Sequence, residues 1–475
     1  MSLSLAFNSA RSSLMATSSQ IEVSSRNTGG ADMPGYSRKI ANTTTSALGS
    51  AYVVQVSRAS DQALYNRMIS ATSRTAGQQA LLSGLNQLQS AVGTPDSANS
   101  PAARISALAD ALAQFRNAPD EPGMGTNAVL AARDLAASLN SAAAGVLDVR
   151  SDADAAIADS VSRVNDLLQQ FAVENSAVVG GTLSGADVTD ALDRRDSILS
   201  QLSEEMGIST VTRPGNDIVI YAAGGATLFE KTPRAVTFQP TAVYGPGTTG
   251  GSVFVDGVAV TGPSAPMPLT SGRITGLTQL RDDVAVTFQT QLDEMANALV
   301  ASFSEHTTLA PPPAPPSAAG LFQAGGSPGS ARSITVNPLV DPAQGGSADR
   351  IRDGITYDYN ADDATSFPDH LQQLVDDLSA QRTFSPTGQI VTQTNLADYG
   401  SASVAWLAAQ RQAASTSADT EAALLSHAST ALSNATGVNM DEEYIHQLDL
   451  EHSYQASSKL IGVINELYDT LLNIR

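Results

Sequence analysis

The chain has 475 residues, too many for one ordinary hydrophobic core, so its length predicts about two to four compact units. Its 26 basic and 47 acidic residues give a formal net charge of −21, which argues against a nucleic-acid-binding protein because neutralising phosphates requires an excess of Lys and Arg. It contains no cysteine, which excludes disulfides, thiolate metal sites and cysteine nucleophiles.

The first 24 residues predict a helix of the coiled-coil type. Apolar or small residues recur there at alternating steps of four and three: Leu3, Phe7, Ala10, Leu14, Thr17, Ile21 and Ser24. This spacing keeps one side of a helix against a partner helix. Because isolated helices are marginal in water, we expect this end of the chain to become ordered on assembly.

A glycine-rich joint follows in the stretch NTGGADMPGYSR. Gly29–Gly30 is expected to end the helix, and Pro34 is expected to hold the residue before it in an extended conformation. Gly35 allows a turn, after which Tyr36 and Arg38 can pack or pair against neighbouring helices. We interpret the stretch as the joint between the terminal helix and the outer domains, not as a phosphate cradle or a catalytic loop.

In the central part of the chain, the spacing of apolar residues changes twice, from helical to strand-like and back to helical. Apolar stripes predict helices over 64–92, 101–115, 127–178 and 188–206, with a proline near the start of the second. The period then becomes that of short β-strands in NDIVIYAAGGATLFE, RAVTFQP and GSVFVDGVAV. Helical periodicity returns over 274–303.

The C-terminal part is mixed and then helical. The stretch LAPPPAPPSAAG predicts an extended spacer, and residues 321–390 combine a strand-like SITVN with a short helix around Leu371, Leu374 and Leu378. A long helix is predicted over 396–434. The end of the chain repeats the four-and-three spacing of the N-terminal helix, and we call each of these two stripes a seam. The C-terminal seam consists of Leu450, Tyr454, Ser457, Ile461, Ile464, Tyr468 and Leu471, and it is flanked by Leu460, Leu467 and Ile474.

This order predicts a mainly α, elongated, multi-domain protein with a β-rich insertion. The predicted units are paired coiled-coil-like terminal helices (1–45 and 435–475), a helical bundle stalk (46–207, 271–306 and 395–434) and an outer β-rich domain (208–270 and 307–394). We expect the two ends to pair with each other and with neighbouring subunits. The alternative is two amphipathic helices that pack on a globular body.

Motifs for chemistry are weak. Gly245–Gly250 matches G-x-G-x-x-G, yet the next residues are strand-like, which favours a hairpin connection over a dinucleotide loop. SDADAA, from Ser151, lacks most ligands of a calcium loop, and no histidine begins an H-E-x-x-H motif. The charges of DALDRRDSILSQL are predicted to form an exposed, ion-paired helix face. The sequence therefore predicts no catalytic residue, no cofactor and no metal site.

The sequence also predicts neither a membrane-spanning segment nor a cleaved signal peptide. No run of about 18 apolar residues predicts a membrane span. The opening stretch MSLSLAFNSARSSLM lacks the basic and apolar regions of a cleaved signal peptide, so an exported chain of this sequence would need another route.

Both ends of the chain resemble flagellar axial proteins. MPGYSRK, after the first seam, is similar to a signature near the start of these proteins. The stretch from Thr436 to Ile474 resembles the closing segment of one family among them, the hook-associated proteins that join hook and filament, and ALDRRDSILSQLSEEMGIS and SGRITGLTQLRDDV resemble its interior. Where that family has Ile-Ala-Asn this chain has Thr28–Gly30, and Met33 replaces a Thr, so the helix is expected to end sooner and the joint to be looser.

The resemblance implies a structural junction protein, not an enzyme, which polymerises as a ring between hook and filament. The implied partners are further copies of the chain, the hook protein, the second junction protein and an export chaperone at the C-terminal helix, with no nucleic acid and no membrane. The implied location is the extracellular flagellum, reached through the flagellar type III apparatus without cleavage. The alternatives are another axial protein, such as the second junction protein or a flagellin, or a secreted adhesin or enzyme on a helical stalk.

Assembly contacts are expected at the two seams and at the joint between them. These residues are Leu3, Phe7, Leu14, Ile21, Pro34, Gly35, Tyr36, Arg38, Leu450, Tyr454, Ile461, Ile464, Tyr468 and Leu471.

Overall fold

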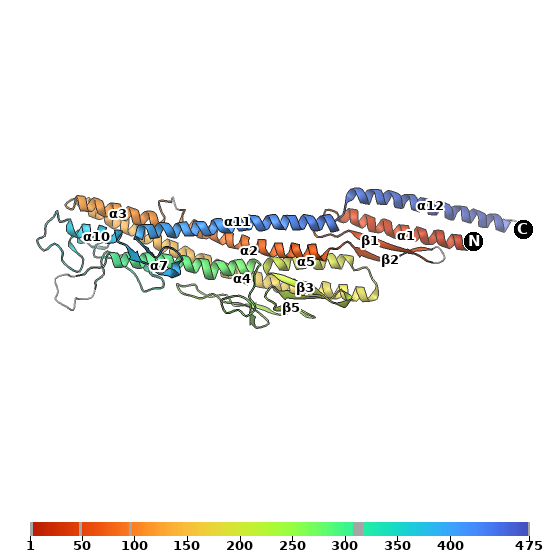
Figure 1. Cartoon of the computed structure of the whole chain (residues 1–475), viewed down its shortest axis with the longest axis horizontal. Coiled ribbons are helices and arrows are strands. Elements are labelled where there is room, and N and C mark those ends of the chain that lie inside the picture. Colours follow the sequence, from red (N-terminus) through yellow and green to blue (C-terminus); the bar gives the residue numbers. More distant parts are fainter. Residues whose placement is uncertain (1–2, 47–49, 95–96, 307–316, 474–475) are drawn as a thin grey trace.

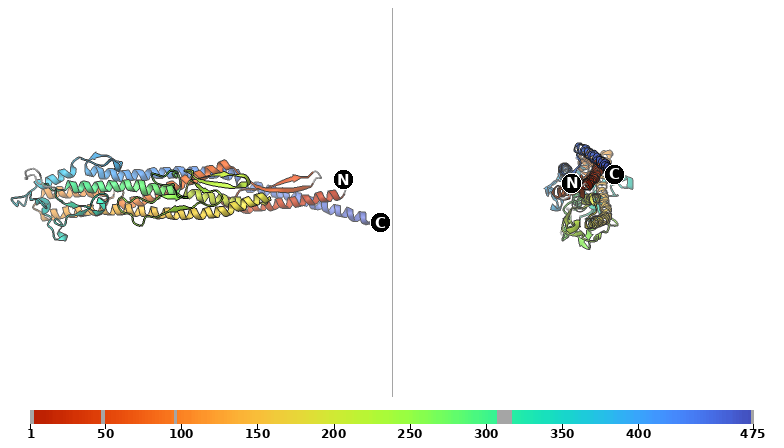
Figure 2. Two further views of the ribbon diagram at one scale, coloured as in Figure 1. Left: turned by 90° about the horizontal axis from the view of Figure 1, so that it is seen from below. Right: turned by 90° about the vertical axis from the view of Figure 1, so that its right-hand side faces the viewer.

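The structure, a computed structural model, describes residues 3–46, 50–94, 97–306 and 317–473. The chain forms a long, thin rod in which helices run lengthwise and both termini lie at the same end (Figures 1 and 2). This confirms the predicted elongated, mainly α architecture with small amounts of sheet.

Long helices build the stalk of the rod. Local signals set their starts: Asp61 Oδ1 accepts a hydrogen bond from Leu64 N at 3.0 Å, and Ser100 caps a helix that begins with Pro101. Figure 1 shows the stalk helix over residues 396–436 lying along the stalk helix over residues 62–92. The stalk helices are α2 (Gln62–Val92), α3 (Pro101–Asn117), α4 (Pro122–Ser184), α5 (Thr189–Glu205), α6 (Arg273–Gln279), α7 (Ala285–Ser302) and α11 (Leu396–Thr436).

The hydrophobic core follows the stalk. A π-helical turn, Leu280–Val284, joins α6 to α7, so that the two form the single predicted helix over 274–303. Apolar stripes from the helices meet along the rod and bury Leu88, Leu112, Leu139 and Phe288 completely. This shared burial makes the stalk one continuous packed unit.

The strands of the described residues form five small antiparallel sheets that share no strand. One pairs β1 (Lys39–Thr45) with β2 (Ala51–Arg58). The insertion between α5 and α6 contains β3 (Ile208–Thr212), β4 (Ile218–Ala222), β5 (Thr227–Phe229), β6 (Val236–Phe238), β7 (Val253–Val255) and β8 (Val258–Ala259). The insertion between α7 and α11 contains β9 (Phe322–Gln323), β10 (Thr335–Val336), β11 (Arg382–Thr383) and β12 (Gln393–Thr394), with helices α8 (Ser330–Ser333), α9 (Arg350–Asp353) and α10 (Asp369–Ser379).

The two insertions take different places on the rod. In Figure 1, β3 and β5 lie beside α5 on the flank of the stalk, whereas α10 lies at the end far from the termini. Residues 309–316 of the predicted proline-rich spacer lie outside the described residues. The division into stalk and one outer β-rich domain stays a prediction.

Two further helices, α1 (Leu3–Gly30) and α12 (Met440–Asn473), pair at the end of the rod that holds both termini (Figure 1). The β1–β2 hairpin lies beside α1. The hairpin was not predicted: residues 39–45 were expected to belong to the terminal helices and residues 51–58 to the helical stalk. In the parts of the chain that the structure describes, no helix has the length and apolarity needed to cross a bilayer.

Candidate functional site

The C-terminal seam forms the covered side of α12. Leu450 and Ile464 are buried, and Ser457, Ile461 and Tyr468 are half-buried. The remaining predicted seam residues, Tyr454 and Leu471, are 41% and 63% exposed. Ile474, predicted to flank the seam, lies outside the described residues. The 4-3 spacing therefore marks the side of α12 that faces α1, with two positions left open to solvent.

The N-terminal seam faces α12 from α1. Its small residues, Ala10, Thr17 and Ser24, are buried, while the larger predicted residues are half-buried: Leu3, Phe7, Leu14 and Ile21. Ser457 Oγ donates to Ser13 Oγ at 3.3 Å, and Ser24 Oγ donates to Glu443 Oε2 at 2.8 Å. Since Ser13 meets the later part of α12 and Ser24 its first turn, the helices run antiparallel.

The joint after α1 is a compact turn. Met33 N donates to Gly30 O at 3.0 Å and Tyr36 N to Met33 O at 3.1 Å, with Pro34 exposed and Gly35 at a φ of +78°. The Tyr36 ring lies against Gly30, where a Cβ atom would come within 2.5 Å of it. The helix thus ends at the predicted glycine, and the aromatic ring fills the space that Gly30 leaves. The looser joint stays a prediction.

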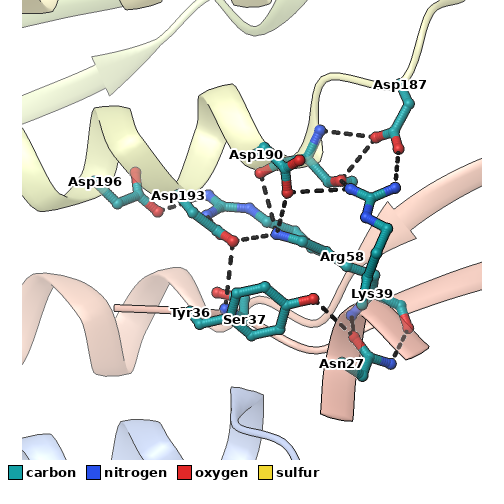
Figure 3. Close-up of polar contacts among 11 residues, drawn as sticks. Asn27, Tyr36, Ser37, Lys39, Arg58, Asp187, Asp190, Asp193 and Asp196 are labelled. Atoms are coloured by element: carbon teal, nitrogen blue, oxygen red, sulfur yellow. Dashed lines mark hydrogen bonds and ion pairs between the residues drawn. The ribbon is translucent and has the colours of Figure 1, made fainter. Parts of the chain in front are cut away.

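One amide, that of Asn27, connects the elements that meet at the joint (Figure 3). Its Oδ1 accepts hydrogen bonds from Lys39 N at 2.7 Å and from Tyr36 Oη at 3.1 Å. Its Nδ2 donates to Lys39 O at 2.9 Å and to Glu443 Oε1 at 3.0 Å. Asn27 is buried, and these bonds use the full capacity of its side chain. The Asn27 side chain on α1 therefore links this helix to the turn, to strand β1 and to helix α12 by hydrogen bonds.

Arg38 adds a second link to the C-terminal part of the chain. Its backbone N donates to Thr436 O at 2.8 Å, and its guanidinium lies 3.5 Å from the carboxylate of Glu442. Both groups of that ion pair are exposed, so the backbone bond carries most of this link.

Buried ion pairs attach the hairpin to α5 (Figure 3). The side chain of Lys39 is completely buried, and its Nζ forms a close ion pair with Asp193. The carboxylate of Asp190 lies farther from the same Nζ, at 3.6 Å. Arg58, which pairs with Lys39 in the β1–β2 register, binds Asp193 Oδ1 at 2.9 Å and Asp196 Oδ2 at 2.6 Å. The two ends of the hairpin thus converge on the same carboxylate.

Burial changes the acid–base properties of this cluster. It raises the pKa of Tyr36 to about 12, although the nearby Arg26 guanidinium acts in the opposite direction. Burial likewise raises the pKa of Asp196, against the attraction of Arg58. For Arg58 burial alone would lower the pKa, but the carboxylates of Asp196 and Asp193 raise it. The cluster is charged but shielded from solvent.

These contacts correct the prediction for DALDRRDSILSQL. Asp193 and Asp196 do not belong to an exposed helix face; they bind cations from a hairpin more than a hundred residues earlier in the chain. Periodicity along α5 contains no information about which element packs on it. The sequence does place a basic residue at each end of this mostly polar segment, Lys39 and Arg58, which indicates that acidic partners exist. It does not indicate which acidic residues they are.

The other sequence motifs have structural roles. Gly245–Gly250 lies in the connection between the paired strands β6 and β7, as predicted. Asp154, from SDADAA, is buried and binds Arg281 Nη1 at 2.6 Å and Tyr244 Oη at 2.8 Å. Within the described residues, no group of three His, Cys, Asp or Glu side chains is arranged to hold a metal ion.

Comparisons with known proteins find matches to the stalk and to the C-terminal helix. A family model for the flagellar hook-associated protein FlgK helical domain matches residues 85–310, and one for the C-terminal part of flagellar basal body rod FlgEFG protein matches residues 430–474. Flagellar hook-associated protein 1 of Escherichia coli K12 is 23% identical over 314 residues, and that of Salmonella typhimurium is 23% identical over 318 residues; each match covers 64% of this chain.

The matches leave part of the relatives uncovered. The chain spans 57% of the length of each of these two proteins. Among solved structures, the flagellar hook junction protein FlgK from Burkholderia pseudomallei is similar at 22% identity with a TM-score of 0.45, over 55% of this chain and 47% of that one. By the family models and the curated relatives, the chain is similar to the flagellar hook-associated protein 1 family over its stalk and to flagellar axial proteins over its C-terminal helix.

Proposed function

We propose that this chain is a structural junction subunit of the bacterial flagellum, which polymerises as a ring between hook and filament and adapts one to the other. The similarity to flagellar hook-associated proteins supports this proposal. The observation that carries it is an apolar surface on α12 that nothing in the described chain covers. The same surface supports a structural role for the chain.

The outer surface of α12 is the part of the helix that lies outside its seam. It carries exposed large apolar side chains along most of the helix: Tyr444, Ile445, Leu448, Leu460, Val463 and Leu467. A helix that is apolar on two sides is normally buried on both. Since α1 covers only the seam, neighbouring subunits are the natural cover for the outer surface.

The proposed partners are those that the resemblance to hook-associated proteins implies, and the outer surface offers them a place to bind. We infer that further copies of the chain cover part of the outer surface and that the hook protein and the second junction protein meet the ring on its two sides. Before assembly, an export chaperone is expected to bind α12 and shield the same side chains. We further infer export through the flagellar type III apparatus to the extracellular flagellum.

A strain that lacks this chain tests the proposal. We expect such cells to retain hooks, to release filament subunits into the medium and to lose motility, because the filament has no adaptor on which to grow. Expression of the full chain from a plasmid should restore attached filaments. Normal, attached filaments in the deletion strain would exclude the junction role.

A further inference from the structure

The β1–β2 hairpin has little stabilisation of its own. It is a two-stranded sheet, which is marginal in water by itself. Tyr52 and Val54 of β2 remain exposed, so the hairpin is not held by an extensive apolar core. Its position therefore depends on the polar contacts at its base, from Lys39 and Arg58 to α5 and from Lys39 to Asn27.

Helix α12 depends on the same amide. Glu443, in its first turn, is buried, and its carboxylate accepts hydrogen bonds from Ser24 Oγ and Asn27 Nδ2. Among the described residues no basic side chain forms an ion pair with it. A buried carboxylate is costly unless donors are held in place. Docking of this turn therefore requires the Asn27 amide to present its Nδ2 to Glu443.

The backbone of β1 sets the orientation of that amide. Lys39 N and Lys39 O bind Oδ1 and Nδ2 of Asn27, so an inverted amide would place donor against donor and acceptor against acceptor. The carboxylate in turn polarises the amide and strengthens its bonds to β1, because hydrogen bonds in a buried chain reinforce one another. Each partner stabilises the arrangement that the other needs.

We propose that Asn27 acts as a positioning residue that makes the order of the β1–β2 hairpin conditional on the docking of α12, and the docking of α12 conditional on the hairpin. Such coupling between two contacts is necessarily reciprocal. If the chain polymerises as proposed above, the hairpin and the outer surface of α12 become available to neighbours together, and a chain with only one of them in place is not competent to assemble.

Hydrogen exchange on the free, full-length chain tests the coupling. Glu443→Ala removes the carboxylate and leaves the contacts of Lys39 and Arg58 with α5 intact. We expect the amides of residues 39–45 and 51–58 to exchange about tenfold faster, within the usual range for coupled sites. Amides in the middle of α4 should keep the wild-type rate and report that the stalk is folded.

A matched variant and a reciprocal variant complete the experiment. Glu451→Ala changes the same residue type at an exposed position of α12 and should leave the hairpin unchanged. Arg58→Leu loosens the hairpin at α5, far from Glu443 in the network, and should speed exchange in the first turn of α12.

The proposal is overturned if Glu443→Ala speeds exchange in α12 alone, or if Arg58→Leu affects only the hairpin. Because exchange is measured on the unassembled chain, this result is independent of the junction role. The coupling can fail while cells without the chain still shed filament subunits, and the reverse outcome is equally distinguishable.

Discussion

The ammonium group of Lys39 and the carboxylate of Asp193 form an ion pair across 154 positions of sequence. Lys39 contributes a side chain with no exposed surface, and Asp193 is shared with Arg58. Inside a protein such a pair stabilises little compared with an apolar contact, yet removing one partner leaves a charge in a dry environment. The pair therefore specifies where the hairpin attaches, more than how stable the chain is.

Loss of this carboxylate should loosen the joint. Asp193→Asn leaves the buried Lys39 ammonium without its closest carboxylate, and we expect a local loss of about 3 kcal/mol, seen as faster proteolysis within residues 27–58. Asp190→Asn is the matched control, because Asp190 is 58% exposed and lies 3.6 Å from Lys39 Nζ. Its effect should stay below about 1 kcal/mol. Equal sensitivity of the two variants would contradict the assignment of Asp193 as the anchor.

Two adjacent glycines should respond in opposite directions to the same substitution. Gly30→Ala places a methyl group within 2.5 Å of the Tyr36 ring and should destabilise the joint by expelling the ring. Gly29→Ala meets nothing within 4 Å and should stabilise α1 by up to about 1 kcal/mol through helix propensity. Protection of the amides of residues 27–38 from exchange measures both. Two stabilising substitutions would mean that Tyr36 does not pack on Gly30.

The Tyr36 hydroxyl predicts a pH dependence at the alkaline side. Its pKa is raised from 10.0 to about 12 in the folded chain, so between these values the unfolded chain loses the proton while the folded chain keeps it. The stabilisation is complete below pH 10 and is lost as the pH rises towards 12. Tyr36→Phe removes this loss.

Chemical unfolding of both proteins over the same pH range measures the effect. The free energy of unfolding should fall more steeply for the wild type than for Tyr36→Phe above pH 10, with the difference at pH 7 as the reference for the lost hydrogen bond to Asn27. Parallel curves throughout would show that the hydroxyl is open to solvent.

The two sides of α12 should be separable by charge substitution. Ile461→Asp combined with Ile464→Asp places carboxylates in the seam against α1 and should release α12 in the free chain, with rapid proteolysis of residues 440–473 and an intact stalk. Val463→Asp combined with Leu467→Asp alters the exposed surface and should leave the free chain unchanged. Both pairs should abolish incorporation into flagella. Normal incorporation of the second pair would mean that neighbours do not cover that surface.

Much of the architecture is determined by local patterns along the chain. The helices over 62–92, 122–184 and 396–436 coincide closely with the predicted apolar stripes, because helix formation depends on side chains three and four positions apart. The paired seams of Leu450, Ile461 and Ile464 on α12 and of Ala10 and Ser24 on α1 follow from the same periodicity. These features need no knowledge of distant neighbours beyond the existence of a partner helix.

The conformation of the joint and of the hairpin beside it depends on contacts between distant parts of the chain. The strand Lys39–Thr45 is mostly polar and lacks the alternation of a half-buried strand, so its conformation depends on the anchors at its base. The partners of those anchors, Asp193 and Asp196 on α5 and Glu443 on α12 through Asn27, come from remote parts of the chain. A single sequence records the charges, but only folding brings them together, because a buried charge is neutralised by whichever group the packing places beside it. The sequence by itself determined the helices and their seams, and the tertiary structure decided how they are joined.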